Sequence, residues 1–305
     1  MKMKKIVILL LLLAACQFVP VQTTQRPPPE IMVGTSALDA SFQSTSMSNI
    51  FMCQEANVYV NVRNSGAYDV RDGAYAFILE EQVLRPVGFK QNRFSLDGRS
   101  QFNPSGGLDQ VNFKFKNVGL PEQLESYASP LIFQACYNYQ TSATVPVCVD
   151  PDLQNLNSRK PCRVQPVGLS GGQGAPVAVT LVETFMIPEG NVVRPKFVVH
   201  VQHLGSGQVV SSENAVAACG VGAGRLRAEV NVYAELQGQP LTCTPSPVKL
   251  EPDKDSIFVC EREDIGYGLA EGTFTTFLHV ELEYGYINTA VLPITITRIA
   301  GQEAC

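Results

Sequence analysis

The sequence predicts an all-β protein that contains two similar β-sandwich domains. Apolar and polar residues alternate in short runs such as NVYVNVRNSG at 57–66, where Val58, Val60 and Val62 are separated by single residues. This period of two is typical of a strand with one buried face. The runs are rich in Val, Ile, Phe, Tyr and Thr, and Gly, Pro and Asn separate them, as in many β-sandwiches.

The chain also repeats itself. KFVVHVQHLG at 196–205 matches the alternation of 57–66. The segment 131–149 aligns without a gap to 278–296, which pairs Tyr137 with Tyr284 and Tyr139 with Tyr286. Two matches in the same order indicate a duplicated domain, and we expect each copy to fold independently.

The first 15 residues resemble a signal peptide. Three lysines precede the apolar run IVILLLLL, and small residues then lead to Cys16. The run is shorter than the roughly 20 residues that span a bilayer as a helix. Leu-Ala-Ala-Cys resembles a prokaryotic lipobox, so we expect a lipid on Cys16 and a membrane-anchored, extracytoplasmic cell-surface protein. In the alternative, a plain secreted protein, Cys16 only lies near the cleavage site.

The remaining chain divides into four parts. Residues 16–30 are polar and proline-rich, which suits a lipid-anchored tether. We expect the first domain at 31–156 and the second at 177–305. Between them, 157–176 is a Gly- and Pro-rich linker without a strand pattern.

The charge balance excludes some ligands. Residues 1–15 carry three lysines and no acidic residue, so their removal changes the net charge from −5 to −8. An acidic chain argues against nucleic acid, and against anionic lipid as a direct ligand.

Two stretches resemble a known family. Val-x-Val-x-Asn-Ser-Gly, ending at Gly66, resembles a strand and turn of CARDB-type immunoglobulin-like domains in prokaryotic surface proteins. CYNYQTSATVPVCVDP, followed by GGQGAPVAVTLVE, is similar to a pattern in uncharacterised archaeal surface lipoproteins. The resemblance covers roughly residues 50 to 300. It implies two tandem immunoglobulin-like sandwiches and a surface location, and no activity.

Eight cysteines remain after Cys16, and export favours disulfides. A turn centred on Ser142 would make 131–149 a hairpin in which Cys136 opposes Cys148, within reach of a disulfide. The repeat has Glu283 and Thr295 at the aligned positions, so both cysteines are absent together. We therefore predict a bridge between Cys136 and Cys148, with other pairings and a metal or redox site as alternatives.

The other predicted bridges depend on position alone. Cys53 precedes a strand and Cys162 follows the last strand of the first domain, so we pair them. In the second domain a turn-rich loop separates Cys243 from Cys260, which leaves Cys219 for Cys305. Four cysteines allow three connectivities in each domain, so the other pairings remain open.

No catalytic constellation, cofactor motif or metal site emerges from the sequence. Asp150, Asp152, Asn155 and Asn157 resemble a calcium loop, but Gln154 and Pro161 replace two of its ligands. The four repeated tyrosines share the phase of apolar neighbours, which predicts a core position.

The expected function is a non-enzymatic structural or protein-binding module with an envelope protein as its partner. A carbohydrate- or solute-binding lipoprotein is the alternative, and the absence of tryptophan counts against it. An envelope hydrolase is a third hypothesis.

Overall fold

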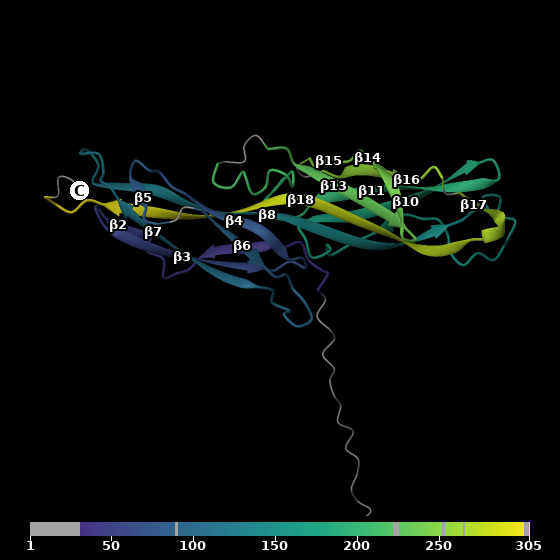
Figure 1. The fold of residues 1–305 in the computed structure, drawn as a ribbon, viewed down its shortest axis with the longest axis horizontal. Coiled ribbons are helices and arrows are strands. Elements are labelled where there is room, and N and C mark those ends of the chain that lie inside the picture. Colours follow the sequence, from purple (N-terminus) through teal and green to yellow (C-terminus); the bar gives the residue numbers. More distant parts are fainter. Residues whose placement is uncertain (1–30, 89–90, 222–225, 252–253, 265, 302–304) are drawn as a thin grey trace, which may run out of the picture.

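The computed structural model describes residues 31–305 except 89–90, 222–225, 252–253, 265 and 302–304. The described chain is all-β, as predicted, and forms an elongated body (Figure 1). Its elements are β1 (Leu38–Phe42), β2 (Asn49–Phe51), β3 (Glu55–Asn64), β4 (Val70–Ile78), β5 (Leu84–Pro86), β6 (Gln91–Leu96), β7 (Leu108–Asn117), β8 (Ser126–Val149), β9 (Val167–Gly168), β10 (Val177–Glu189), β11 (Val192–His203), β12 (Gln208–Val210), β13 (Glu229–Leu236), β14 (Gln239–Thr244), β15 (Val248–Lys249), β16 (Ser256–Glu261), β17 (Tyr267–Gly268), the 3₁₀ turn η1 (Leu269–Glu271) and β18 (Phe274–Thr297).

The two halves of the chain use their strands in the same way. In the first half, β1, β3, β7 and β5 form a four-stranded sheet, and it lies against β6, β4 and β8. In the second half, β10, β11 and β16 are neighbours in one part of the larger sheet, whereas β13 lies between β14 and β18. The central strands β3 and β11 are the two that the first sequence match aligns.

The predicted alternation is confirmed in both central strands. On β3 the side chains of Val58, Val60 and Val62 are fully buried, and on β11 those of Phe197, Val199 and Val201 are fully buried. The intervening residues of both strands are only partly covered. Period-two patterning therefore predicted which face of each strand forms the core.

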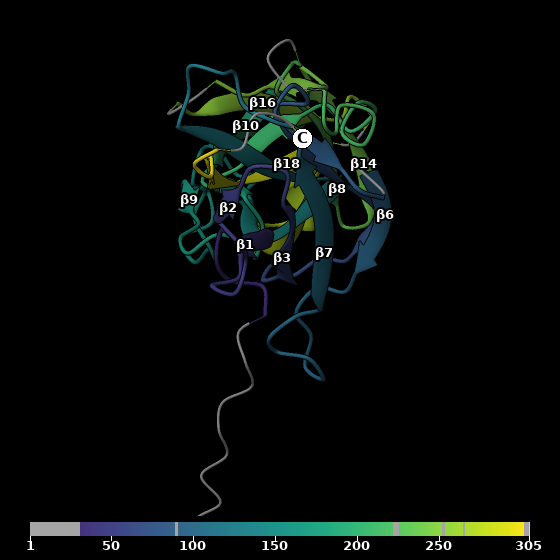
Figure 2. The same ribbon diagram turned by 90° about the vertical axis from the view of Figure 1, so that its left-hand side faces the viewer.

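The long strands β8 and β18 join the two halves. They pair antiparallel along all 24 residues of each, so that they form one ribbon along the body (Figures 1 and 2). Tyr137 lies opposite Tyr286, and Tyr139 lies opposite Tyr284. The repeat therefore has an approximate two-fold axis at the pair formed by Asn138 and Gly285.

Each long strand serves both halves. The first part of β8 pairs with β4, while its residues 139–149 pair with the first part of β18, which also pairs with β13.

The predicted hairpin at Ser142 is therefore wrong, and Ser142 faces Glu281 across the ribbon. Residues 139–145 contain no Gly, Pro, Asn or Asp, so Ser142 is the only residue there that favours a turn. The segment 157–176, predicted to be a linker without strands, contains β9, which pairs with β10, and it joins two halves of one continuous sheet.

The four tyrosines lie in the core, as predicted. Their exposed fractions are at most 4%. Their hydroxyls bond within the core: Tyr137 Oη lies 2.5 Å from Asn288 Oδ1 and accepts the Leu38 backbone N–H at 3.1 Å. Tyr284 Oη lies 3.0 Å from Thr141 Oγ1. Burial of a phenol without such a partner would be costly, so these bonds let polar rings occupy the middle of the ribbon.

All eight predicted disulfide cysteines are paired, but only one predicted pair is correct. Cys243 and Cys260 lie directly opposite each other on β14 and β16, with their Cα atoms 4.1 Å apart, and are joined as predicted.

The predicted bridge between Cys136 and Cys148 is wrong because both lie on one continuous strand. Twelve residues of extended strand separate their Cα atoms by about 40 Å. Cys136 does face away from the main core, as its phase predicted. That face is covered by the loop 211–221, and Cys136 bonds to Cys219 of this loop.

The same long strand also explains the error for Cys53 and Cys162. Cys53 lies near the start of β8, whereas Cys162 follows its end. β8 is about 80 Å long, and the 13 residues from 150 to 162 reach at most about 45 Å, so the two cysteines cannot meet. Cys162 instead bonds to Cys148. The predicted pair Cys219 and Cys305 is also wrong, because Cys219 is used by Cys136.

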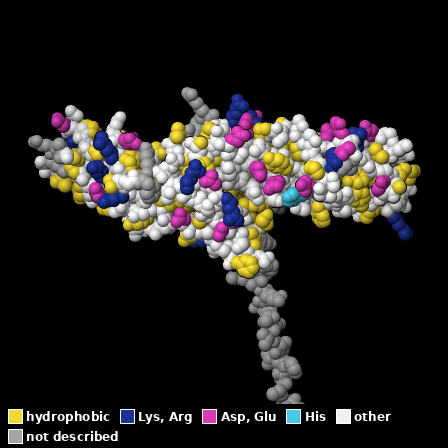
Figure 3. All heavy atoms as spheres, in the orientation of Figure 1, with side chains coloured by type: hydrophobic (Ala, Val, Ile, Leu, Met, Phe, Trp, Pro, Cys, Tyr) yellow, Lys and Arg dark blue, Asp and Glu magenta, His cyan; other side chains and the backbone are white. Residues whose placement is uncertain are grey.

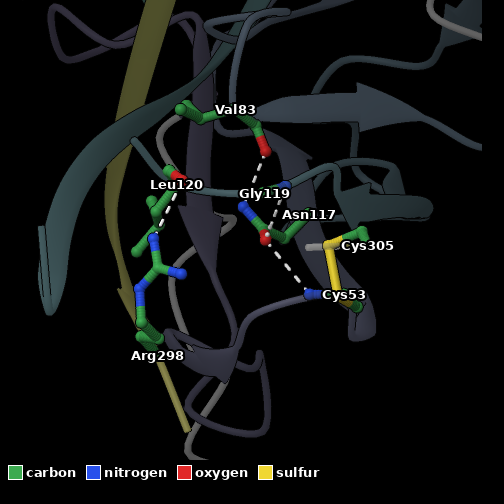
Figure 4. Close-up of a disulfide and its surroundings, with 7 residues drawn as sticks. All are labelled: Cys53, Val83, Asn117, Gly119, Leu120, Arg298 and Cys305. Atoms are coloured by element: carbon green, nitrogen blue, oxygen red, sulfur yellow. Dashed lines mark hydrogen bonds between the residues drawn. A yellow bond between two sulfur atoms is a disulfide. The ribbon is translucent and has the colours of Figure 1, made fainter. Parts of the chain in front are cut away.

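Cys305 bonds to Cys53 where the end of β18 lies beside β2 (Figure 4). The buried Asn117 supports this junction: its Oδ1 accepts the backbone N–H groups of Cys53 and Gly119, each at 3.1 Å. Arg298 of the chain after β18 donates to the Leu120 carbonyl at 3.0 Å. Two of the four disulfides therefore join the first half of the sequence to the second.

Candidate functional site

The loop that follows β8, residues 150–163, is the strongest candidate site in the described chain, and we call it the tip loop. It begins where Val149 pairs with Phe274, at the end of the body that carries β17 and η1 (Figure 1). The Cys148–Cys162 disulfide ties its far end back to β8. A short irregular segment is thereby closed into a ring.

A lysine and two aspartates organise the tip loop from within. Lys160 Nζ lies 2.7 Å from Asp150 Oδ2 and 3.6 Å from Asp152 Oδ2, and it donates to the Asp152 carbonyl at 2.5 Å. The three side chains are only 8 to 14% exposed. An ion pair with this little solvent contact is held by several charge-assisted bonds.

The aspartates also bind the backbone around them. Asp152 accepts the backbone N–H groups of Leu156 at 2.9 Å and Asn157 at 2.8 Å. Asp150 accepts the Thr273 hydroxyl at 2.7 Å, which links the loop to the residue before β18. These bonds order the loop without a long strand or helix in it.

The pKa values follow from these contacts. Burial by itself would raise the pKa of Asp150, but the hydrogen bonds from Lys160 and Thr273 outweigh it and hold that pKa below its usual value. The backbone N–H groups of Asn157 and Leu156 lower the pKa of Asp152. The hydrogen bond to Asp150 raises the pKa of Lys160. All three groups are therefore charged near neutral pH.

Lys160 occupies the position that a calcium ion would take between Asp150 and Asp152. Its ammonium lies between the two carboxylates that would otherwise be free to hold a cation. No group of three or more His, Cys, Asp or Glu side chains in the described ranges is arranged to hold a metal ion. In the sequence, Gln154 and Pro161 depart from the calcium-loop pattern, and the role of Lys160, beside that proline, was not predicted. A lone lysine in an Asp- and Asn-rich segment between two cysteines is the signal that could have identified it.

Two clefts adjoin the tip loop. One has a volume of about 780 Å³ and is lined by loop residues, including Arg163, together with Thr184, Phe185 and Met186 of β10. The second, of about 460 Å³, is more apolar and includes Leu153, Leu156, Pro188 and Leu269 in its lining. Cavities of this size accommodate small ligands or the side chains of a partner.

The larger cleft contains an unsatisfied polar group. Thr184 Oγ1 is buried and has no hydrogen-bond partner among the described residues. Phe185 beside it is 46% exposed. A buried hydroxyl without a partner and an exposed aromatic ring are both features that a ligand would complement.

The remaining predicted site residue, Cys16, lies outside the described residues. Among the described residues, no helix has the length and apolar character that a membrane span requires. In comparisons with known proteins, neither a protein-family model nor a curated protein matches the chain. The proposals below therefore depend on the sequence and the geometry.

Proposed function

We propose that the protein is a non-enzymatic, lipid-anchored cell-surface protein that binds an envelope protein through its tip loop. The observation that carries the proposal is the tip loop itself: a disulfide-closed ring, ordered by an internal ion pair, with two clefts beside it. A loop that is rigid before binding loses little conformational entropy when a partner docks. Loops at the end of a rigid β-scaffold are common positions for recognition.

The surface location is supported by the export-type N-terminus and by four disulfides, which form and persist in oxidising compartments. The strands of the two halves correspond in chain order. The places of β1, β3, β4, β6, β7 and β8 in the first half are taken in the second half by β10, β11, β13, β14, β16 and β18. This repeated order, with central strands in facing layers, supports two immunoglobulin-like units of the CARDB type that exchange their last strand through the ribbon.

The binding proposal is tested by photo-crosslinking on intact cells. A photoreactive amino acid replaces Leu153, which is 46% exposed and lines the second cleft, and in a matched control it replaces Tyr233 on β13, which is 51% exposed. We expect one discrete protein adduct from position 153 and none from 233. Identical adducts from both positions, or none from either, would contradict binding at the tip loop.

The anchor has its own test. Cys16→Ser should leave the protein unprocessed or release it from the membrane fraction. Unchanged membrane retention, with no lipid on residue 16 of the original protein by mass spectrometry, would contradict the lipoprotein assignment.

A small-molecule function is the second candidate, and the exposed ring of Phe185 in the larger cleft favours it. A sugar or another polar solute would stack on this ring. In a glycan-binding screen, a ligand that is lost on Phe185→Ala, while position 153 gives no protein adduct, would support this candidate over the first.

A further inference from the structure

The start of the described chain is held against two other segments. Gly34 donates its backbone N–H to the Gly171 carbonyl at 2.6 Å and accepts that of Gly174 at 2.8 Å. Arg99 Nη2 donates to the Ile31 carbonyl at 2.8 Å. We call the surface formed by residues 31–38, 98–108 and 166–176 the collar, because it surrounds the point where the chain enters the body.

The collar is almost free of charge. Its three segments read IMVGTSAL, GRSQFNPSGGL and PVGLSGGQGAP, and Arg99 is their only charged residue. Charged residues are 17% of the whole chain, so about five would be expected in these 30 positions. Arg99 also bonds to the carbonyls of Ile31 and Val33, which occupies its guanidinium within the collar. This surface therefore differs from the acidic remainder of the protein.

Large apolar side chains project from the collar. Phe102 is 99% exposed, Leu108 55% and Met32 47%. Yellow hydrophobic side chains are visible beside the point where the described chain begins (Figure 3). Phe102 is held in an ordered turn, because Ser100 and Gly106 both donate their backbone N–H groups to the Asn103 carbonyl, at 3.0 and 3.1 Å. A fixed and fully exposed phenylalanine beside other apolar residues indicates an interaction surface.

The collar lies near the middle of the body rather than at either end. Leu38 donates its backbone N–H to Tyr137 Oη at 3.1 Å, and Tyr137 is next to the central ribbon residue Asn138. Fourteen residues, 17–30, separate Cys16 from the collar. Fully extended, the 15 steps from Cys16 to Ile31 reach at most about 50 Å. A lipid on Cys16 would therefore attach the body to the bilayer near its middle, and at neither tip.

We propose that the collar is the face that the anchored protein turns to the lipid bilayer, with Phe102 inserted among the headgroups and the long axis of the body along the membrane. The proposal rests on the lipid anchor proposed above. An uncharged surface with exposed aromatic and aliphatic side chains suits the interface of a neutral or zwitterionic bilayer, where apolar side chains leave water without pairing charges. With the chain entering at mid-length, the tip loop is carried to the side of the anchor.

The sequence contains no tryptophan, so a single introduced tryptophan reports its own surroundings. The full lipidated chain carrying Phe102→Trp is reconstituted on phosphatidylcholine vesicles, with and without brominated acyl chains that quench indole fluorescence. The matched control is Tyr233→Trp on β13, an exposed residue that lies outside the three collar segments. Both positions are exposed, so neither change disturbs the core.

We expect the indole at position 102 to shift its emission to the blue and to lose more than half its intensity to the bromine, while position 233 changes by less than a tenth. If the protein floats with the vesicles but neither indole is quenched, or both are quenched equally, the collar does not face the membrane. The lipid anchor would not be contradicted by this result. If the original protein isolated from cells carries no lipid on Cys16 and does not float with the vesicles, both the anchor and the membrane-facing role of the collar would be refuted.

Discussion

Separating the two halves of the chain is the most direct test of the shared ribbon. In the intact protein, residues 139–149 of β8 pair with residues 274–284 of β18. A fragment of residues 31–165 retains all of β8 and lacks β18. Cys53→Ser and Cys136→Ser remove the two cysteines whose partners, Cys305 and Cys219, are missing from it.

The cost of leaving this part of β8 uncovered follows from its buried side chains. Val145, Val147 and Val149 are 0%, 2% and 0% exposed, and Tyr139 is 4% exposed. Fully burying one such side chain is worth about 1.5 to 3 kcal/mol, so exposing these four would cost about 6 to 12 kcal/mol. Whole domains have unfolding free energies of about 5 to 15 kcal/mol. A monomeric fragment with β8 extended therefore lacks stabilisation comparable to the whole unfolding free energy of a domain.

A second copy of the fragment can replace β18. Since Tyr137 faces Tyr286, the repeat counterpart of Tyr139, two β8 strands can pair antiparallel with Asn138 opposite Asn138. We expect residues 31–165 to form a dimer by light scattering at concentrations where the intact chain is a monomer. A monomeric fragment that unfolds cooperatively would refute the reasoning, because β8 would then fold back on itself near Ser142.

Three further outcomes follow from the described contacts. Replacing Cys136 and Cys219 with serine opens a loop of 83 residues and should lower the unfolding free energy by up to about 4.5 kcal/mol. Replacing Cys243 and Cys260, which close a loop of 17 residues, should lower it by about 3 kcal/mol. Equal losses of unfolding free energy in denaturant titrations would argue against the chain-entropy model. The carboxylates beside Lys160 have lowered pKa values, so their stabilisation is complete above their ordinary pKa of about 3.9 and disappears as the pH falls through the lower folded value. The stability difference between the original protein and Lys160→Met, followed by thermal unfolding, should accordingly be largest near pH 7 and smallest below pH 3. A chelator should leave the melting temperature unchanged, since the lysine occupies the space between the carboxylates, and a fall of several degrees would contradict this.

The candidate site was only partly predictable. The sequence analysis identified Asp150 and Asp152 as an unusual polar cluster and rejected the calcium loop because ligands were missing. It did not identify Lys160, because an ion pair between residues eight and ten apart in an irregular loop has no periodic signature. Only the folded loop brings the ammonium within 2.7 Å of Asp150. The clefts depend on β10 and η1, which are remote in sequence from the tip loop.

The sequence by itself determined which side of the central strands β3 and β11 is buried. Alternation on β3 and β11, and the phase of the repeated tyrosines, identified core residues correctly, because the pleat turns successive side chains to opposite faces wherever the strand lies. The even number of cysteines after an export-type N-terminus likewise predicted that all eight would pair, and they do.

Only the tertiary structure decided which strand pairs with which. Alternation from 131 to 149 is the same in a hairpin and in one continuous strand, since both keep the same residues on the core face. The choice depends on whether β18 offers a better partner than β8 folded back on itself, and β18 matches β8 over its full length. Two disulfide predictions, Cys136 with Cys148 and Cys53 with Cys162, failed because a continuous strand of about 80 Å separates cysteines that a hairpin would have brought together. The third, Cys219 with Cys305, failed because Cys219 bonds to Cys136.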